Sequence, residues 1–172
     1  MKHGLIGFAW LAAVLVLGLA GCGSEDAVEE TAVQATDPGL AMCSLCSMVV
    51  AEQPVPRAQV VHRDGHRVFL CTVSELGPYL QAPSSHGKPA VIFVEVLAAG
   101  DDGNPVSLEP HPWVDAASAF YVVEGAERPV MGESVLAYRN REEAQAMALA
   151  SGGNVIAWEE VEDFLRSKVA AQ

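Results

Sequence analysis

The stretch AQVVHRDGHRVFLCTVSE, residues 58–75, decides the fold. Residues 58–62 and 67–70 are rich in β-branched and aromatic residues, which predicts two strands. Asp64-Gly65 between them is a strong signal for a hairpin turn. Residues 72–75 have the form of a capping box, in which a hydroxyl and a carboxylate each satisfy a first-turn amide. The stretch therefore predicts a hairpin followed directly by a helix.

Further elements extend this hairpin in both directions. Residues 47–52 are expected to form a preceding strand, and the capped helix is expected to end near Gln81, before Pro83. Residues 90–97 are nearly all apolar, which is typical of a central strand. We therefore expect a first ββαβ unit over residues 40–99.

The second half of the chain repeats this order. Asn140 and Glu143 form a second cap pattern, each 68 positions after Thr72 and Glu75 respectively. The expected elements are strands at 119–123, 134–139 and 154–159 and helices at 142–150 and 161–169. The sequence thus predicts an α+β fold of two ββαβ units in a duplicated arrangement, the second over residues 119–172, with a turn-rich connector at 100–118. Two unrelated α+β halves are the alternative.

The N-terminus has the pattern of an export signal. Residues 1–21 begin with a short basic region and continue as an uncharged apolar run that ends in small residues. Leu19-Ala20-Gly21-Cys22 resembles the lipobox of bacterial lipoproteins, in which the signal is removed and the cysteine is acylated. Gly23 stands where an Asp would retain such a lipoprotein in the inner membrane. We expect a lipid anchor on Cys22 facing the periplasm, at the outer membrane; a permanent anchor helix is the alternative.

The charge distribution separates a tether from the folded part. Residues 22–39, which follow the signal, carry five acids and no base, so we expect the lipidated cysteine and a flexible acidic tether there. The whole chain has a net charge of -12, and the signal contributes one lysine and no acid. This acidity excludes a general nucleic-acid binder, which needs Lys and Arg to neutralise phosphates.

Soft metal ligands are concentrated in MCSLCSM, residues 42–48. Thiols and thioethers select Cu(I), whereas thiolates also suit zinc and iron–sulfur clusters. Cys46 and Met48 are two residues apart, so on a strand both side chains would leave the same face and could bind one ion. Met42 would share that face and Cys43 would not, but Cys43 is also a candidate ligand beside Cys46 and Met48. The alternative is a Cys43–Cys46 disulfide, with the methionines in the core.

A zinc site is a second alternative, because Cys43, Cys46, His62 and His66 have the spacing of a two-Cys, two-His site. A two-residue loop at Asp64-Gly65 would point the two histidines to opposite faces of the hairpin and prevent this, whereas a three-residue loop would permit it. We expect exposed hairpin histidines.

Four other residues are weaker candidates for metal ligands. Cys71 at a strand end is expected to be a small buried hydrophobic residue, since nothing in the sequence places it near the other thiols. Met131 lies in a loop and is a candidate for completing the site from the second half. His86 and His111 are candidate nitrogen donors.

Several motifs occur along the chain in a specific order. They are Cys43-x-x-Cys46-Ser47-Met48, Asp64-Gly65, Trp113-Val114-Asp115-Ala116 followed by Ala119-Phe120-Tyr121-Val122, Met131-Gly132, and Glu142-Glu143-Ala144 through Gly152-Gly153. In this combination, over residues 40–165, the chain resembles NosL-type copper lipoproteins, which are accessory proteins of nitrous oxide reductase.

This resemblance implies a metallochaperone and not an enzyme. It implies one Cu(I) ion, passed to nitrous oxide reductase or to its maturation machinery. The Cys-x-Met pair of the family falls on Cys46 and Met48, and its Met-Gly on Met131 and Gly132. The family usually has Gly between Cys and Met, where this chain has Ser47. A glycine there would serve a positive φ or the close approach of a partner.

No catalytic set other than the thiols is evident in the sequence, which has no nucleophile elbow, phosphate-binding loop or HExxH. The alternative function is therefore a periplasmic thiol-disulfide oxidoreductase, or a zinc-binding lipoprotein, that uses Cys43 and Cys46. An oxidoreductase would need both cysteines and would be indifferent to Met48.

Overall fold

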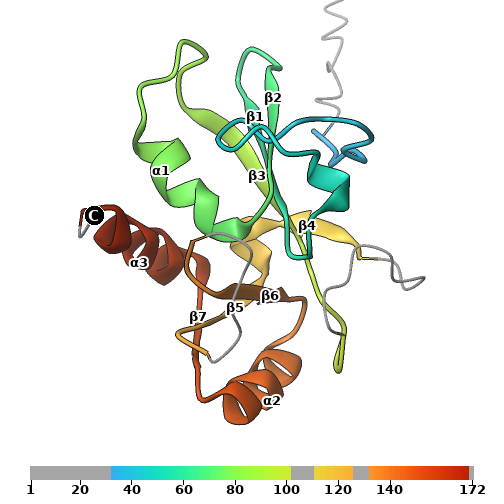
Figure 1. Cartoon of the computed structure of the whole chain (residues 1–172), viewed down its shortest axis with the longest axis vertical. Helices are drawn as coiled ribbons and strands as arrows, with labels where there is room; N and C mark the ends of the chain where they lie inside the picture. Colours follow the sequence, from blue (N-terminus) through green and yellow to red (C-terminus); the bar gives the residue numbers. More distant parts are fainter. Residues whose placement is uncertain (1–31, 102–110, 126–131, 171–172) are drawn as a thin grey trace, which may run out of the picture. The chain divides into compact units, whose positions relative to one another are not determined.

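The computed structural model describes residues 32–101, 111–125 and 132–170, and residues 33–172 form one compact unit (Figure 1). The signal, Cys22, Met131 and residues 102–110 of the connector lie outside the described residues. No helix in the described ranges is long and apolar enough to cross a bilayer. The strands are β1 (Ala58–His62), β2 (Arg67–Leu70), β3 (Pro89–Glu95), β4 (Trp113–Asp115), β5 (Phe120–Val123), β6 (Val135–Tyr138) and β7 (Asn154–Ile156). The helices are α1 (Leu76–Gln81), α2 (Arg141–Ser151) and α3 (Trp158–Ala170), with short 3-10 turns η1 (Val50–Glu52), η2 (Val73–Glu75) and η3 (Ala116–Ser118).

The strands form two antiparallel sheets whose first three members follow the same order. The first sheet has the order β2-β1-β3-β4 and the second β6-β5-β7. In each sheet the first strand of a hairpin is central, its partner is on one side, and the strand after the helix is on the other side. The prediction of an α+β fold with two ββαβ units is confirmed.

The capping signals act as the sequence predicts. Glu75 Oε2 accepts a hydrogen bond from the backbone N of Thr72, and the capping box opens the turn η2, which leads into α1. Asn140 Oδ1 accepts from the backbone N of Glu143 at the start of α2, and α2 ends at Gly152 in the left-handed conformation. These caps fix where each helix starts relative to the strand before it.

One apolar core joins the two sheets. On β5, Tyr121 and Val123 belong to the core cluster shared with the first sheet, whereas Val122 packs in a second cluster with residues of α2. Helices α1 and α3 lie against each other at Gly77, where a Cβ would stand 3.1 Å from Leu165 Cβ. A larger residue at position 77 would force the two helices apart.

Three of the predicted boundaries are wrong. Residues 47–52 do not form a strand: Val49 makes an isolated bridge to Met42 and Val50–Glu52 form the turn η1, because this backbone folds back on residues 41–43. The connector contains the strand β4, which pairs with β3 through Val114 and Val94. The last strand ends at Ile156 and α3 begins at Trp158, earlier than the apolar pattern indicates.

Candidate metal centre

The segment that carries the Cys-x-x-Cys motif lies on the free edge of the first sheet. Cys43 makes a parallel bridge to Phe69 of the edge strand β2, and the backbone N of Ser44 donates to the Phe69 oxygen at 3.1 Å. The segment closes on itself, since Cys43 N donates to Met48 O at 2.8 Å and Ser47 N donates to Cys43 O at 3.0 Å. Cys46 therefore lies in a turn and not on a strand. The alternation that would place Cys46 and Met48 on one face of a strand does not apply here.

Ser47 has a φ of 61°, in the left-handed region that favours glycine. This is the position at which the resemblance to NosL-type sequences implies a glycine. The backbone conformation explains the preference, because a Cβ costs about 1 kcal/mol or more in this region. Ser47 adopts this left-handed conformation in spite of the energetic cost of its Cβ.

The turn brings the two thiols of the motif to a third thiol and a carboxylate. The ligand atoms of Cys43, Cys46, Cys71 and Glu75 all lie within 4.8 Å of one another, and we call these four residues the thiol cluster. Cys46 Sγ is 3.5 Å from Cys71 Sγ, and Cys43 Sγ donates a hydrogen bond to Glu75 Oε2 at 3.2 Å. All three cysteines are free thiols, so the disulfide alternative is not what the structure shows.

Glu75 connects the cluster to the start of helix α1. Its Oε2 also accepts from the backbone N of Cys71 at 2.7 Å and from that of Thr72 at 3.3 Å. Its Oε1 is buried and makes no hydrogen bond within the described part of the chain. A buried oxygen without a donor normally costs stability, so it is available to a bound cation or to a proton.

Burial distinguishes the three thiols. Cys43 and Cys71 are 3% and 1% exposed, while Cys46 is partly open to solvent. Desolvation raises the pKa of Cys43 and the pKa of Cys71, and for Cys71 the hydrogen bond to Cys46 and the nearby Cys43 and Glu75 raise it further. The two buried thiols therefore keep their protons until a metal replaces them, and Cys46 is the thiol that an incoming ion can reach first.

The methionines of the sequence prediction have different surroundings. Met48 is half-buried and packs against the main core cluster, as Cys46 does, whereas Met42 is 60% exposed. Met131 lies outside the described residues. Gly132, which follows it, has a φ of 72° and lies against Ser74, so that a Cβ there would stand 2.4 Å from Ser74 Oγ. Residue 132 thus contacts the turn that carries Glu75.

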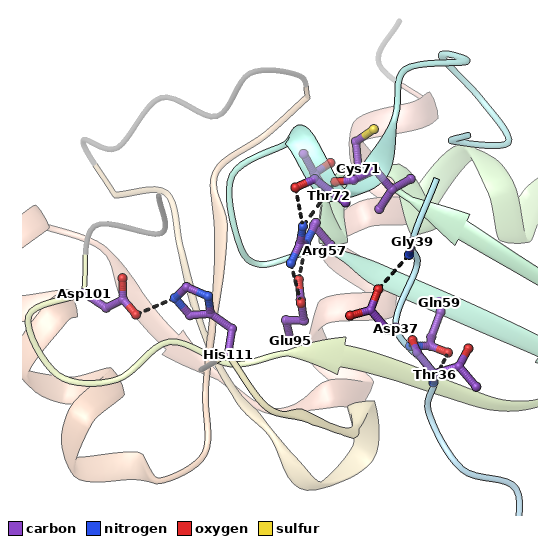
Figure 2. Close-up of polar contacts among 12 residues, drawn as sticks. Thr36, Asp37, Gly39, Arg57, Gln59, Cys71, Thr72, Glu95, Asp101 and His111 are labelled. Carbon is purple, nitrogen blue, oxygen red and sulfur yellow. Dashed lines mark hydrogen bonds and ion pairs between the residues drawn. The ribbon is translucent and has the colours of Figure 1, made fainter. Parts of the chain in front are cut away.

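A buried ion pair anchors the end of the Cys-x-x-Cys segment. Arg57 Nη2 donates to Glu95 Oε1 at 2.6 Å, and its Nε donates to Glu95 Oε2. Arg57 Nη1 donates to the carbonyls of Val50 and Ala51 at 3.3 and 3.0 Å. Figure 2 shows this pair. Arg57 thereby ties the turn after the metal motif to β1 and β3.

His111, a candidate nitrogen donor, also appears in Figure 2, beside Asp101. Its Nε2 is 2.6 Å from Asp101 Oδ2, and both side chains are 7% exposed. The described residues do not bring it to the thiol cluster, whose members are three cysteines and Glu75. The structure assigns His111 to a pair of buried side chains within the connector.

The hairpin loop differs from the two-residue prediction. Val61 pairs with Arg67 and His62 N donates to His66 O at 2.8 Å, so the loop has three residues, 63–65. The rings of His62 and His66 are consequently on the same side, with centroids 6.1 Å apart. The expectation of exposed hairpin histidines is right for His66 and wrong for His62, which is buried. The zinc site of two cysteines and two histidines is nevertheless not formed, because Cys43 and Cys46 gather with Cys71 and Glu75 instead.

Sequence reasoning missed Glu75 as a member of the site and could not place Cys71, a weaker candidate, beside the other thiols. Cys71 directly follows the edge strand on which the Cys-x-x-Cys segment lies, and Glu75 was interpreted only as a capping residue. One signal in the sequence could have indicated both residues: Cys71 stands immediately before the capping box. The carboxylate of such a box, here Glu75, turns back towards the end of the preceding strand and therefore towards this cysteine.

These features define a class: an α+β protein with a candidate site for one soft metal ion at the edge of its first sheet. The chain belongs to the NosL family, whose family model matches residues 35–165. It is 31% identical over 163 residues to the copper-binding lipoprotein NosL of Stutzerimonas stutzeri, covering 94% of this chain and 83% of that protein. It is also 31% identical over 167 residues to the copper-binding lipoprotein NosL of Achromobacter cycloclastes, covering 92% and 81%.

A solved structure supports the fold. The crystal structure of the copper chaperone NosL from Shewanella denitrificans superposes with a TM-score of 0.58 at 22% identity, over 74% of this chain and 93% of that one. At this identity the similarity concerns the arrangement of helices and strands alone. These relatives are named as copper-binding lipoproteins or chaperones and not as enzymes.

Proposed function

We propose that this chain is a membrane-anchored Cu(I) metallochaperone that delivers copper for the assembly of the copper centres of nitrous oxide reductase. The observation that carries the proposal is the thiol cluster, in a chain whose relatives are named copper-binding lipoproteins. Thiolates are the ligands that select Cu(I) over harder ions.

Cys46 is the first ligand of the incoming ion. It is the thiol of the cluster that is open to solvent, and its sulfur is 3.5 Å from that of Cys71. Cys43 and Cys71 complete a sulfur set for one ion. Glu75 accepts a hydrogen bond from the Cys43 thiol and takes up its proton when the metal binds. Each thiol loses its proton when it binds metal, so binding is favoured by rising pH.

Met48 and Met131 supply the thioether donors in this proposal. Met48 follows Cys46 by two residues and lies at the border of the core, where a change of rotamer brings a flexible thioether to a neighbouring site. The contact of Gly132 with Ser74 supports Met131 as the donor from the second half of the chain. When the ion passes to a partner, ligands of the partner replace these weaker thioethers first, while Cys46 still holds the ion.

The remaining parts of the proposal concern location and partner. Cys22 carries the lipid and residues 23–39 span the distance from the membrane to the domain, with the domain facing the periplasm from the outer membrane. The recipient is the reductase itself or its maturation machinery. The acidic chain suits a basic partner surface, since opposite charges speed the encounter of two proteins.

Zinc binding is the second candidate function, and Glu75 is the observation that favours it. Three thiolates and one carboxylate make a tetrahedral set for Zn²⁺, and Oε1 of Glu75 is buried without a hydrogen bond among the described residues. In that case the affinity for Zn(II) would depend on Cys43, Cys71 and Glu75 as strongly as on Cys46. It would not depend on either methionine.

Titration of the reduced full chain in detergent, with Cu(I) and Zn(II) each against a competing chelator, separates the two candidates. We expect one equivalent of Cu(I), bound more tightly than zinc. Cys46→Ser should weaken Cu(I) binding at least a hundredfold, and Met48→Leu about tenfold. Met42→Leu is the matched control, because this methionine is 60% exposed, and it should change nothing.

Tighter binding of zinc, or Cu(I) affinity unchanged by Cys46→Ser, would contradict the proposal. Thermal unfolding of each variant shows whether a loss of binding reflects a loss of structure. Disulfide reductase activity that needs Cys43 and Cys46 equally would favour the oxidoreductase instead.

A further inference from the structure

The tip of the β1–β2 hairpin carries a second group of ligand residues, which the proposed function does not use. His62 and His66 flank the three-residue loop, and Asp64 lies within it. His86 comes from the connection between α1 and β3, which lies beside this loop (Figure 1). We call these four residues the histidine cluster.

The three rings are close together. The rings of His66 and His86 are stacked, with centroids 3.6 Å apart and an angle of 8° between their planes. The ring of His62 is 5.7 Å from that of His86 and 6.1 Å from that of His66. Three imidazoles from two separate segments thus meet at one end of the sheet.

Asp64 contacts the ring of His86 and the backbone of His66. Its Oδ2 accepts a hydrogen bond from Nδ1 of His86 at 2.7 Å, and its Oδ1 accepts from the backbone N of His66 at 3.0 Å. These contacts lower the pKa of Asp64, the bond to His86 being the largest cause, and keep it ionised. Because Nδ1 of His86 donates to this carboxylate, its Nε2 is free to act as a ligand. Metal-binding histidines in proteins commonly have such a carboxylate on the other ring nitrogen.

His62 is the buried member of the histidine cluster, and both of its ring nitrogens already make hydrogen bonds. It is 2% exposed, with Nδ1 2.9 Å from the Gly87 oxygen and Nε2 2.7 Å from the Tyr79 hydroxyl. These contacts hold the segment of His86 against the hairpin. The two outer histidines, by contrast, are open to solvent, with the side chain of His86 35% exposed.

We propose that His66 and His86, positioned by Asp64, form a second metal site that binds a divalent cation of borderline softness, such as Cu(II) or Zn(II). Imidazole suits these ions, and Cu(II) has the highest affinity for a given nitrogen site among the common divalent metals. The two rings are stacked 3.6 Å apart, so binding of one ion requires them to tilt until a ring nitrogen of each faces it; the exposed segment around His86 allows this. Water fills the remaining positions.

This site is separate from the thiol cluster. The strand β2 lies between His66 and Cys71, and at 3.3 Å per residue this places the two sites roughly 16 Å apart along the hairpin. Nitrogen donors at one end and thiols at the other allow the chain to hold borderline and soft ions at different places. The proposal does not depend on the thiol cluster binding Cu(I).

Titration with Ni(II), which is borderline and does not oxidise thiols, tests the site. All proteins are full chains in detergent that also carry Cys46→Ser, which removes the accessible competing thiol. We expect one equivalent of Ni(II), with affinity at least tenfold weaker in His66→Ala and in His86→Ala. Asp64→Asn should weaken it by about 10-fold to 100-fold, as is typical of a residue that orients a ligand.

Ser85→Ala, next to His86 and also exposed, is the matched control and should bind Ni(II) like the parent chain. Because His66 and Ser85 are on the surface, these variants are expected to fold, and thermal unfolding checks this. Equal affinity in all of these proteins, or the absence of Ni(II) binding, would overturn the proposal. Loss in the histidine variants but not in Asp64→Asn would overturn the role given to the aspartate.

Discussion

The two ends of the β1–β2 hairpin carry donors of opposite character. At one end Cys43 and Cys71 are buried and Glu75 accepts three hydrogen bonds at one oxygen. At the other end His66 is exposed, and Asp64 makes analogous contacts at the surface. The same strand pair therefore carries a largely buried candidate sulfur site at one end and the exposed nitrogen site that we propose at the other. Because the thiol end is buried, we expect substitutions there to lower the free energy of unfolding more than substitutions at the exposed histidine end.

The largest effect is expected at the anchor of the thiol end. Arg57→Ala removes the partner of Glu95, whose side chain is 3% exposed, and frees the carbonyls of Val50 and Ala51. Breaking a buried ion pair from one side costs about 3–5 kcal/mol. Urea unfolding measures this loss, and the Cu(I) affinity should fall as the Cys-x-x-Cys segment loosens.

The exposed pair of Arg166 and Asp163 on α3 provides the control for this prediction. Arg166→Ala should cost at most about 1 kcal/mol, because solvent screens a surface pair. If the two arginine variants were equally stable, the thiol end would not depend on a buried anchor.

The next effect concerns the two carboxylates. Glu75→Ala removes the acceptor of two backbone amides and of the Cys43 thiol, which should cost about 2 kcal/mol in the free energy of unfolding. Asp64→Ala removes similar contacts at the exposed tip and should shift the unfolding midpoint far less. Equal shifts would show that burial does not distinguish the two ends of the hairpin.

A smaller effect, of opposite sign, is expected at Ser47. Ser47→Gly relieves a φ of 61° and should stabilise the chain by up to about 1 kcal/mol. The Cu(I) affinity should stay the same, since no ligand is changed. Ser44→Gly, in the same turn but without a positive φ, should instead be neutral or destabilising. Stabilisation by both changes would mean that the turn conformation is not the cause.

The smallest effect is a pH dependence at the histidine end. The pKa of Asp64 is lowered in the folded chain, mainly by its bond to His86, so its contribution is present above the unfolded pKa and is lost as the pH falls through the lowered folded value. The difference in stability between the parent chain and Asp64→Asn should therefore vanish in acid. A difference that grew on acidification would contradict the assignment of the bond.

Local signals in the sequence account for most of the fold. The caps at Thr72 and Asn140 and the apolar strands around residues 60, 92 and 121 were predicted because each depends on neighbouring residues only. The segment 47–52 was predicted wrongly, since its hydrogen bonds go to residues 41–43 and to Arg57, contacts that no local pattern encodes. The strand β4 was missed for the same reason.

The site was predicted in part. The Cys-x-x-Cys motif was identified, but Cys71 joins it only because the segment lies along the edge of β2, which is a tertiary contact. The strand geometry assumed for Cys46 and Met48 was wrong, although both residues lie next to the same core cluster. The loop of the hairpin has one more residue than its Asp-Gly turn indicates, and this brings His62 and His66 to one side.

X-ray absorption at the copper edge of the reduced, Cu(I)-loaded full chain tests the central claim most directly. We expect a first shell of sulfur only, with one scatterer fewer in Cys46→Ser. A first shell without sulfur, or a spectrum unchanged by Cys46→Ser, would show that the copper is not held by the thiol cluster and would contradict the proposed function.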